Sequence, residues 1–160
     1  MDDVKAVFHD LERRANELGV SMKPPLRSTD LAAWAADAQS ALKFDVPAGY
    51  LTLLGLSNGL ATQRGYLYEA EIFVEQNYVR WYCETRGRVT PEGYVVEYIP
   101  LADPPTPEYA LLGAYGNMDE YVFDFASAEY RVTQLGSADQ VWFSSPTLGG
   151  LLQYVTETET

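Results

Sequence analysis

The stretch Phe44–Gly59, FDVPAGYLTLLGLSNG, predicts a short helix with a defined start and a defined end. Pro47 suits the first helical turn, where a backbone N–H has no partner inside the helix. The run that follows is mostly apolar, so most of the helix surface is expected to be buried. Asn58-Gly59 predicts the end, because both residue types tolerate the left-handed conformation of a C-cap.

Two amphipathic helices are expected before this stretch. Over residues 2–18, apolar side chains recur at three- and four-residue spacing, at Val4, Phe8, Leu11, Ala15 and Leu18. Gly19 then follows as a helix end. A second stripe predicts a helix over residues 30–43, and Ser28-Thr29-Asp30 offers its N-cap.

The chain after Gly59 is expected to be mainly strand. Alternation predicts a half-buried strand over Tyr66–Phe73, with Glu69 and Glu71 on one face. Residues 75–86 suit a helix or a strand, and a helix is favoured. Gly87–Gly93 is expected to be a turn region. Further strands are expected at Tyr94–Leu101, Ala110–Tyr115, Tyr121–Phe125, Glu129–Leu135 and Val141–Phe143, before a final helix that starts at Pro146.

These elements predict a single α+β domain over residues 1–160. We expect a mostly antiparallel sheet of about five to six strands, flanked by N-terminal helices and a closing C-terminal helix. No segment approaches the roughly 18–20 apolar residues that a membrane span needs. Cys83 is the one cysteine and excludes an internal disulfide, and the charged N-terminus does not resemble a signal peptide. A cytoplasmic location is therefore expected.

The net charge of −12 is concentrated in the second half of the chain. Residues 1–88 carry 10 Lys and Arg against 12 Asp and Glu, whereas residues 89–160 carry only Arg131 against 11 acids. Such a surface repels nucleic acid and anionic membranes, and it attracts a basic protein. The alternative interpretation is that the acidic charge serves only to keep the protein soluble.

One catalytic pattern matches, but its context does not. Residues 55–59, GLSNG, fit the G-x-S-x-G nucleophile elbow, which requires a strand before the serine and a histidine later in the chain. Here a helix is expected before Ser57, and the only histidine is His9, far upstream. His9 and Cys83 alone do not form a metal site. A carboxylate pair such as Glu69 and Glu71 leaves an enzyme as a remote third hypothesis.

The order of motifs resembles the SUKH superfamily, which includes a yeast cell-wall assembly regulator and many bacterial immunity proteins, and within it the YrhA-like branch. The resemblance spans roughly residues 28–155. It is carried by a V-P-x-x-Y-x-x-L-L motif followed by Asn58-Gly59, by an aromatic strand, and by a closing leucine-rich helix. The motif residues are Val46, Pro47, Tyr50, Leu53 and Leu54. Residues 74–108 match the family pattern least.

The resemblance implies a non-catalytic protein-binding module without a cofactor or metal. It implies an immunity protein that binds and neutralises a bacterial toxin, and the acidic charge indicates a basic toxin domain. The candidate partner-binding residues are Glu69, Glu71, Asp119, Glu120, Asp124 and Glu129. Pro47, Tyr50, Asn58 and Gly59 would be structural. The alternative hypothesis is a regulatory or scaffold protein that binds a housekeeping partner.

Overall fold

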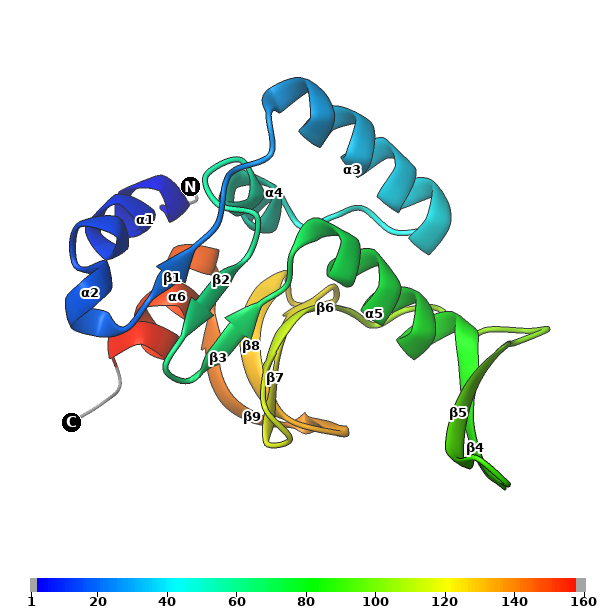
Figure 1. The fold of residues 1–160 in the computed structure, drawn as a ribbon. Coiled ribbons are helices and arrows are strands. Elements are labelled where there is room, and N and C mark those ends of the chain that lie inside the picture. The colour runs from blue at the N-terminus through cyan, green and yellow to red at the C-terminus, as the bar shows by residue number, and fades with distance from the viewer. Residues whose placement is uncertain (1–2, 158–160) are drawn as a thin grey trace.

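The computed structural model describes residues 3–157 and has the predicted α+β architecture (Figure 1). Its elements are, in chain order, α1 Val4–Arg13, α2 Ala15–Leu18, β1 Ser21–Met22, α3 Ser28–Leu42, α4 Ala48–Leu54, β2 Leu60–Thr62, β3 Gly65–Leu67, α5 Ala70–Tyr82, β4 Cys83–Thr90, β5 Gly93–Pro100, β6 Tyr109–Tyr115, β7 Asp119–Asp124, β8 Glu129–Gln134, β9 Ser137–Ser145 and α6 Leu148–Glu157.

An antiparallel sheet of seven strands, more than the five to six expected, forms the centre of the described chain. Its strand order is β1-β2-β3-β6-β7-β8-β9, and every neighbouring pair is antiparallel. Strands β3 and β6 pair directly, although α5 and the β4–β5 hairpin lie between them in the sequence. The hairpin forms a separate two-stranded sheet that projects away from the rest of the molecule (Figure 1).

The helices α1, α4 and α6 pack on one another and supply much of the hydrophobic core. Helix α6 also contacts β8 and β9, which ties this helical layer to the sheet. The buried apolar side chains of the three helices are Val4, Val7, Phe8, Leu11, Tyr50, Leu53, Leu54, Leu148, Leu151, Leu152 and Val155. The stripe predicted for the last helix is thus confirmed as core, and so are Val4, Phe8 and Leu11 of the first stripe, whereas Ala15 and Leu18 are partly buried against it.

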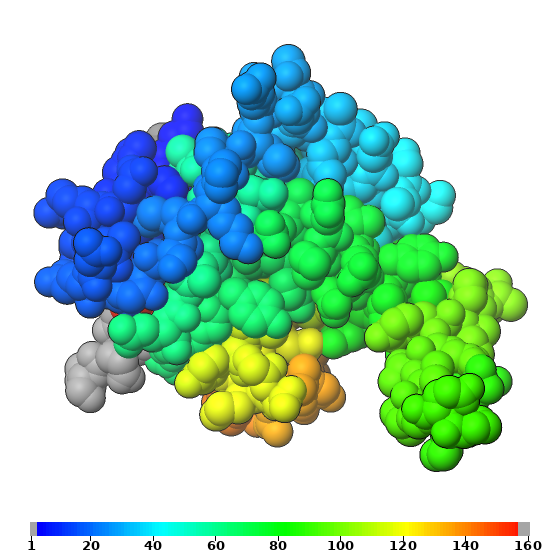
Figure 2. Space-filling view, in the orientation of Figure 1, coloured from blue at the N-terminus to red at the C-terminus, as the bar shows by residue number. Residues whose placement is uncertain are grey.

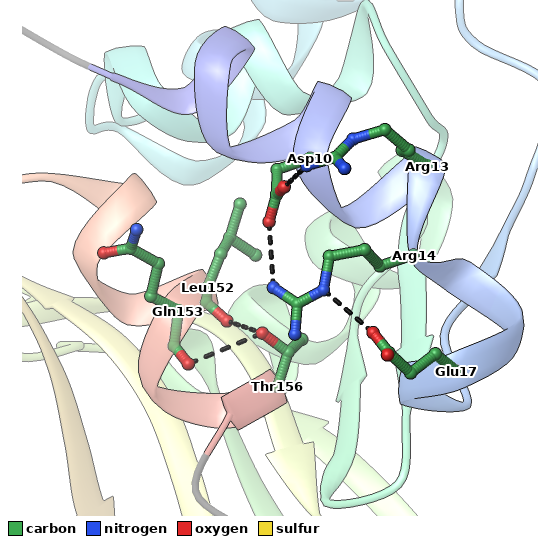
Figure 3. Close-up of polar contacts among 7 residues, drawn as sticks. All are labelled: Asp10, Arg13, Arg14, Glu17, Leu152, Gln153 and Thr156. Carbon is green, nitrogen blue, oxygen red and sulfur yellow. Dashed lines mark hydrogen bonds and ion pairs between the residues drawn. The ribbon is translucent and has the colours of Figure 1, made fainter.

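The helix expected over residues 2–18 is divided at Arg14, whose φ and ψ of −104° and 14° are not helical. The Arg14 side chain spans the break, because its guanidinium pairs with Asp10 at 3.0 Å and with Glu17 at 3.0 Å (Figure 3). Gly19 ends α2 in the left-handed conformation, as predicted, with a φ of 68°.

The helix expected within Phe44–Gly59 is shorter than predicted, and its predicted end was wrong. Helix α4 ends at Leu54, four residues before Asn58. Leu56 and Ser57 each donate a backbone hydrogen bond to the Leu53 carbonyl, which closes the last turn. Asn58 instead accepts the backbone N–H of Ala70 on its Oδ1 at 2.9 Å. It therefore caps the start of α5, a contact that the local sequence does not reveal.

The strand expected over Tyr66–Phe73 was also wrong in its second half. Strand β3 ends at Leu67, and α5 begins at Ala70. The buried residues of α5 follow a helical repeat: Ala70, Phe73, Asn77 and Trp81. The start of this repeat coincides with an alternating pattern, which explains the error. The helix favoured for residues 75–86 is confirmed as far as Tyr82.

Asn77 attaches α5 to the edge of β6. Its fully buried side chain donates from Nδ2 to the Leu111 carbonyl at 2.9 Å, and its Oδ1 accepts the Leu111 N–H at 2.8 Å. Nδ2 also donates to the Phe73 carbonyl at 2.8 Å. The ladder between β3 and β6 does not extend to Leu111. The Asn77 amide therefore makes the two hydrogen bonds that a neighbouring strand would otherwise make there.

The turn expected over Gly87–Gly93 was wrong, since β4 runs through Gly87 to Thr90 and only Pro91 and Glu92 lie outside the two strands. Tyr94 lies over Gly87, where any side chain would overlap the tyrosine ring. The glycine is therefore explained by aromatic packing across the hairpin and not by a turn.

The last third of the chain agrees best with the sequence. Strands β6, β7 and β8 lie within one or two residues of the ranges expected, and residues 125–128 form the hairpin loop. Strand β9 is longer than the three residues expected, because it extends along β8 as the sheet edge. Among residues 3–157, no helix is long and apolar enough to span a membrane.

Candidate functional site

Three of the four residues expected to be structural contact the connection from β3 to α5, and the fourth, Pro47, stands at the start of α4. Tyr50 is fully buried, stacks on Phe73 with a ring-centre distance of 4.8 Å, and donates its O–H to the Tyr68 carbonyl at 2.6 Å. Pro47 is the N-cap of α4, and its carbonyl accepts the Leu51 N–H at 3.1 Å.

Asn58 and Gly59 occupy the turn from α4 into the sheet. Asn58 donates its backbone N–H to the Pro24 carbonyl at 3.2 Å, in addition to capping α5. Gly59 has a φ of +91°, and a Cβ there would lie 3.0 Å from backbone atoms of Leu67 and Glu69. This position therefore favours glycine on both conformational and steric grounds.

The serine of the G-x-S-x-G pattern is buried, and its hydroxyl is engaged with the backbone. Ser57 Oγ accepts the Lys23 N–H at 2.9 Å and donates to the Gly59 carbonyl at 2.6 Å. His9 lies on α1, where its ring contacts Phe8 and Glu12. The pattern thus serves the turn after α4 in this fold.

The six acidic residues expected to bind a partner do not lie on one surface. Glu69 and Glu71 belong to α5: Glu69 is its N-cap and pairs with Lys23 at 3.1 Å, and Glu71 lies in its first turn. Asp119 and Asp124 stand at opposite ends of β7, and Glu129 is the cross-strand partner of Asp124.

Glu120 is buried and forms a two-pronged ion pair with Arg80 of α5. The guanidinium donates to the carboxylate at 3.2 Å and 2.5 Å, and it also donates to the Tyr109 hydroxyl at 2.5 Å. Burial acts to lower the pKa of Arg80, but the carboxylate of Glu120 outweighs it and raises this pKa. Glu120 is therefore occupied inside the fold and is not part of the exposed acidic surface.

Asp124 and Glu129 form a polar cluster around Arg131. Partial burial acts to raise the pKa of Asp124, but hydrogen bonds from Ser127 and the charge of Arg131 outweigh it, so that pKa is lowered. The pKa of Glu129 is lowered chiefly by the hydrogen bond from Ser144 at 2.9 Å and then by Arg131 at 3.2 Å. Both carboxylates are therefore held in their charged form.

Acidification is expected to destabilise the protein through this cluster. A carboxyl whose pKa is lower in the folded state contributes stability above its ordinary pKa and loses it as the pH falls. We therefore expect the urea midpoint to fall between about pH 5 and pH 3. In the double variant Asp124→Asn, Glu129→Gln this fall should be shallower. The exposed Asp139→Asn serves as control and should keep the wild-type slope; equal slopes in all three proteins would contradict the prediction.

A different surface combines exposed apolar side chains with acid, at the end of the sheet formed by the β6–β7 and β8–β9 turns. We call it the Trp142 patch; its members are Met118, Asp119, Leu135 and Trp142. Met118 and Trp142 are 62% and 54% exposed. The Leu135 N–H donates to the Met118 carbonyl at 3.0 Å, and Trp142 Nε1 donates to Asp119 Oδ1 at 3.0 Å. These contacts hold the four residues together.

Of these four residues, only Asp119 is among the binding residues predicted from the sequence. Trp142 stands between Val141 and Phe143 in a run of three apolar residues, which predicts a strand but not which side chain is exposed. The strand register shifts at this point, because Val132 pairs with Phe143 and Thr133 with Val141, which leaves Trp142 as the extra residue. Phe143 stacks on Tyr154 of α6 at 4.3 Å, whereas Trp142 is exposed.

A shallow pocket of about 350 Å³ lies where the β4–β5 hairpin leaves the body. Its lining is mixed in polarity and comprises Gln76, Val79, Arg80, Cys83, Thr85, Tyr98 and Leu111. Figure 2 shows the hairpin separated from the turns at the end of the sheet by an open notch.

In the part of the chain that the structure describes, no three His, Cys, Asp or Glu residues are grouped closely enough to hold a metal ion. Comparisons with known proteins found no match among family models, curated proteins or solved structures.

Proposed function

We propose that this chain is a non-catalytic immunity protein of the SUKH type, which neutralises a basic bacterial toxin domain by binding it directly. The Trp142 patch is the observation that carries the proposal. Binding energy in protein interfaces is concentrated in a few large side chains, and tryptophan is prominent among them. An exposed tryptophan whose indole N–H is held by a carboxylate presents a rigid apolar surface at little entropic cost.

The charge distribution indicates the chemistry of the partner. Residues 89–160, which include the Trp142 patch, hold Arg131 as their one Lys or Arg against 11 acids. Arg131 lies with Asp124 and Glu129, away from Asp119 at the other end of the β7–β8 ladder. The acidic charge of residues 89–160 should attract a basic partner, and the encounter rate should fall as salt increases. The proposed site of action is the cytoplasm, because a single cysteine suits a reducing compartment.

Capture from a lysate of the source bacterium, at low and at moderate salt, is the first test of the proposal. A basic polypeptide with toxic activity should be recovered at low salt and weakened by added salt. It should lose its toxicity when mixed with this protein. Recovery of a housekeeping protein instead, with no toxin at either salt, would move the assignment to the regulatory or scaffold hypothesis.

Replacing Trp142 with alanine is expected to weaken binding of the captured toxin roughly 30-fold, about 2 kcal/mol. The dissociation rate should carry most of this change, since anchoring side chains act mainly after the encounter. Surface plasmon resonance against the purified toxin domain measures it. Tyr78→Ala removes another exposed aromatic side chain, on α5, and should leave the affinity within about twofold. Equal effects of the two variants would exclude the Trp142 patch as the anchor.

Charge reversal at the same end of the sheet separates steering from anchoring. Asp139→Lys, which leaves the contact between Asp119 and Trp142 in place, should slow association and flatten its dependence on salt, with a smaller change in dissociation. Glu71→Lys on α5 is the control for charge reversal elsewhere. An unchanged association rate in Asp139→Lys would show that acidic charge does not guide the partner.

A further inference from the structure

The β4–β5 hairpin has one uncharged face and one charged face. Its strands pair in an unbroken register of eight residue pairs, from Cys83 opposite Pro100 to Thr90 opposite Gly93. Residues opposite one another share a face, and successive residues alternate. One face, which we call the apolar face, therefore carries Cys83, Thr85, Gly87, Val89, Tyr94, Val96, Tyr98 and Pro100.

The opposite face is charged and internally neutralised. Arg88 pairs with Glu97 at 2.5 Å across the strands, and Arg86 pairs with Glu84 at 3.3 Å along β4. The charged side chains of this face are therefore paired with one another within the hairpin. The large side chains of the apolar face form no such pairs.

The body of the protein covers only the root of the apolar face. Thr85 and Tyr98 line the pocket beside Arg80, whereas Val89 and Tyr94, near the tip, are 83% and 71% exposed. No residue of β4 or β5 belongs to the buried core. A two-stranded hairpin in water is marginally stable at best, and a contiguous exposed apolar surface normally marks an interface.

We infer that the apolar face is a self-association surface, on which the hairpin of a second copy of this chain packs face to face across a two-fold axis. The charges argue for this occupant. The apolar face has no charged residue, so it offers no electrostatic attraction to a basic partner. The hairpin carries Glu84, Glu92 and Glu97 against Arg86 and Arg88, almost neutral in a chain of −12. It is therefore the segment through which two strongly acidic copies can touch with the least repulsion.

The area of the apolar face sets the expected strength of the association. The two tyrosines and two valines that are exposed on the apolar face can bury on the order of 500 Å² of accessible surface per copy. The dimer would bury on the order of 1,000 Å² in total. That total lies near the lower limit of specific interfaces, so a weak dimer is expected, with a Kd on the order of 10 to 100 μM. This inference goes beyond the proposed function, because it concerns a different surface and a different partner.

Sedimentation equilibrium of the purified full-length chain tests the inference without any other ligand. The average mass should rise from 17.9 kDa toward twice that value as the concentration increases from about 5 μM to about 500 μM. The association should become severalfold stronger when NaCl is raised from about 50 mM to about 500 mM, because salt screens the repulsion between the acidic bodies. Binding of a basic toxin should respond to salt in the opposite direction.

A matched pair of variants locates the surface. Val96→Glu places a charge on the apolar face and should weaken dimerisation at least tenfold, since two like charges would meet in the interface. Val95→Glu adds the same charge one residue away on the other face, opposite Arg88, and should leave the Kd within about threefold. Far-UV circular dichroism and the urea midpoint check that both variants fold.

Three outcomes would overturn the inference: a monomeric wild-type protein at about 500 μM and high salt, equal dimerisation by both variants, or a dimer that weakens with added salt. Trp142→Ala should leave self-association unchanged, and Val96→Glu should leave toxin affinity unchanged. Failure of this inference is therefore distinguishable from failure of the proposed function.

Discussion

Replacing Asn77 with leucine is expected to lower the free energy of unfolding by about 3–5 kcal/mol. The variant keeps the helical position and adds an apolar side chain, but it deprives both the N–H and the carbonyl of Leu111 of their partner. These groups are buried, and each buried polar group left without a hydrogen bond costs about 1–3 kcal/mol. The overlap of a branched side chain with the edge of β6 adds to the loss.

Urea denaturation followed by tryptophan fluorescence measures the Asn77→Leu effect. Glu75→Leu introduces the same residue at an exposed position two residues earlier on α5 and should change stability by less than about 0.5 kcal/mol. Amide hydrogen exchange gives a second readout, because the Leu111 N–H should lose its protection in the Asn77 variant. A loss below about 1 kcal/mol would show that the amide is not needed at this edge of the sheet.

Arg80→Met is expected to cost about 3–5 kcal/mol, because it leaves the carboxylate of Glu120 buried without its cation. The double variant Arg80→Met, Glu120→Met should recover most of this loss. An apolar pair can replace a buried ion pair at little cost when its volume is similar. The loss of stability in the double variant should therefore be much smaller than the sum of the losses in the two single variants.

A thermodynamic cycle of wild type, two single variants and the double variant measures this coupling. Arg88→Met, Glu97→Met on the exposed hairpin provides a parallel cycle, with a coupling of at most about 1 kcal/mol. Tyr109→Phe removes the hydroxyl that accepts a hydrogen bond from Arg80 and separates its contribution. If the double variant is as unstable as Arg80→Met alone, the loss comes from packing of the arginine and not from an orphaned charge.

The parts of the fold that were predictable are those in which local pattern and tertiary contacts agree. Leu148, Leu151, Leu152 and Val155 repeat at helical spacing and are all buried. In β6–β8, each strand pairs with its neighbour in sequence through a short turn, so local signals are enough to place it.

The errors occur where a distant residue decides the structure. The start of α5 depends on Asn58, twelve residues earlier, and the path of β4 through Gly87 depends on Tyr94 across the hairpin. Neither contact has a signature in the segment that it controls. Composition likewise reveals charge, whereas only the fold reveals that Glu120 faces Arg80 inside the protein. Trp142 was placed in its strand but was not recognised as exposed.

The direct pairing of β3 with β6 has a consequence for the order of folding. The chain leaves the sheet after Leu67, builds α5 and the hairpin, and returns at Tyr109 to pair with the strand that it left. Strands β6 to β9 can assemble from contacts close in sequence, whereas β3 must close a long loop to find its neighbour. We therefore expect a nucleus in the C-terminal meander, with the N-terminal strands joining it late in folding and the amide of Asn77 sealing the junction between the two.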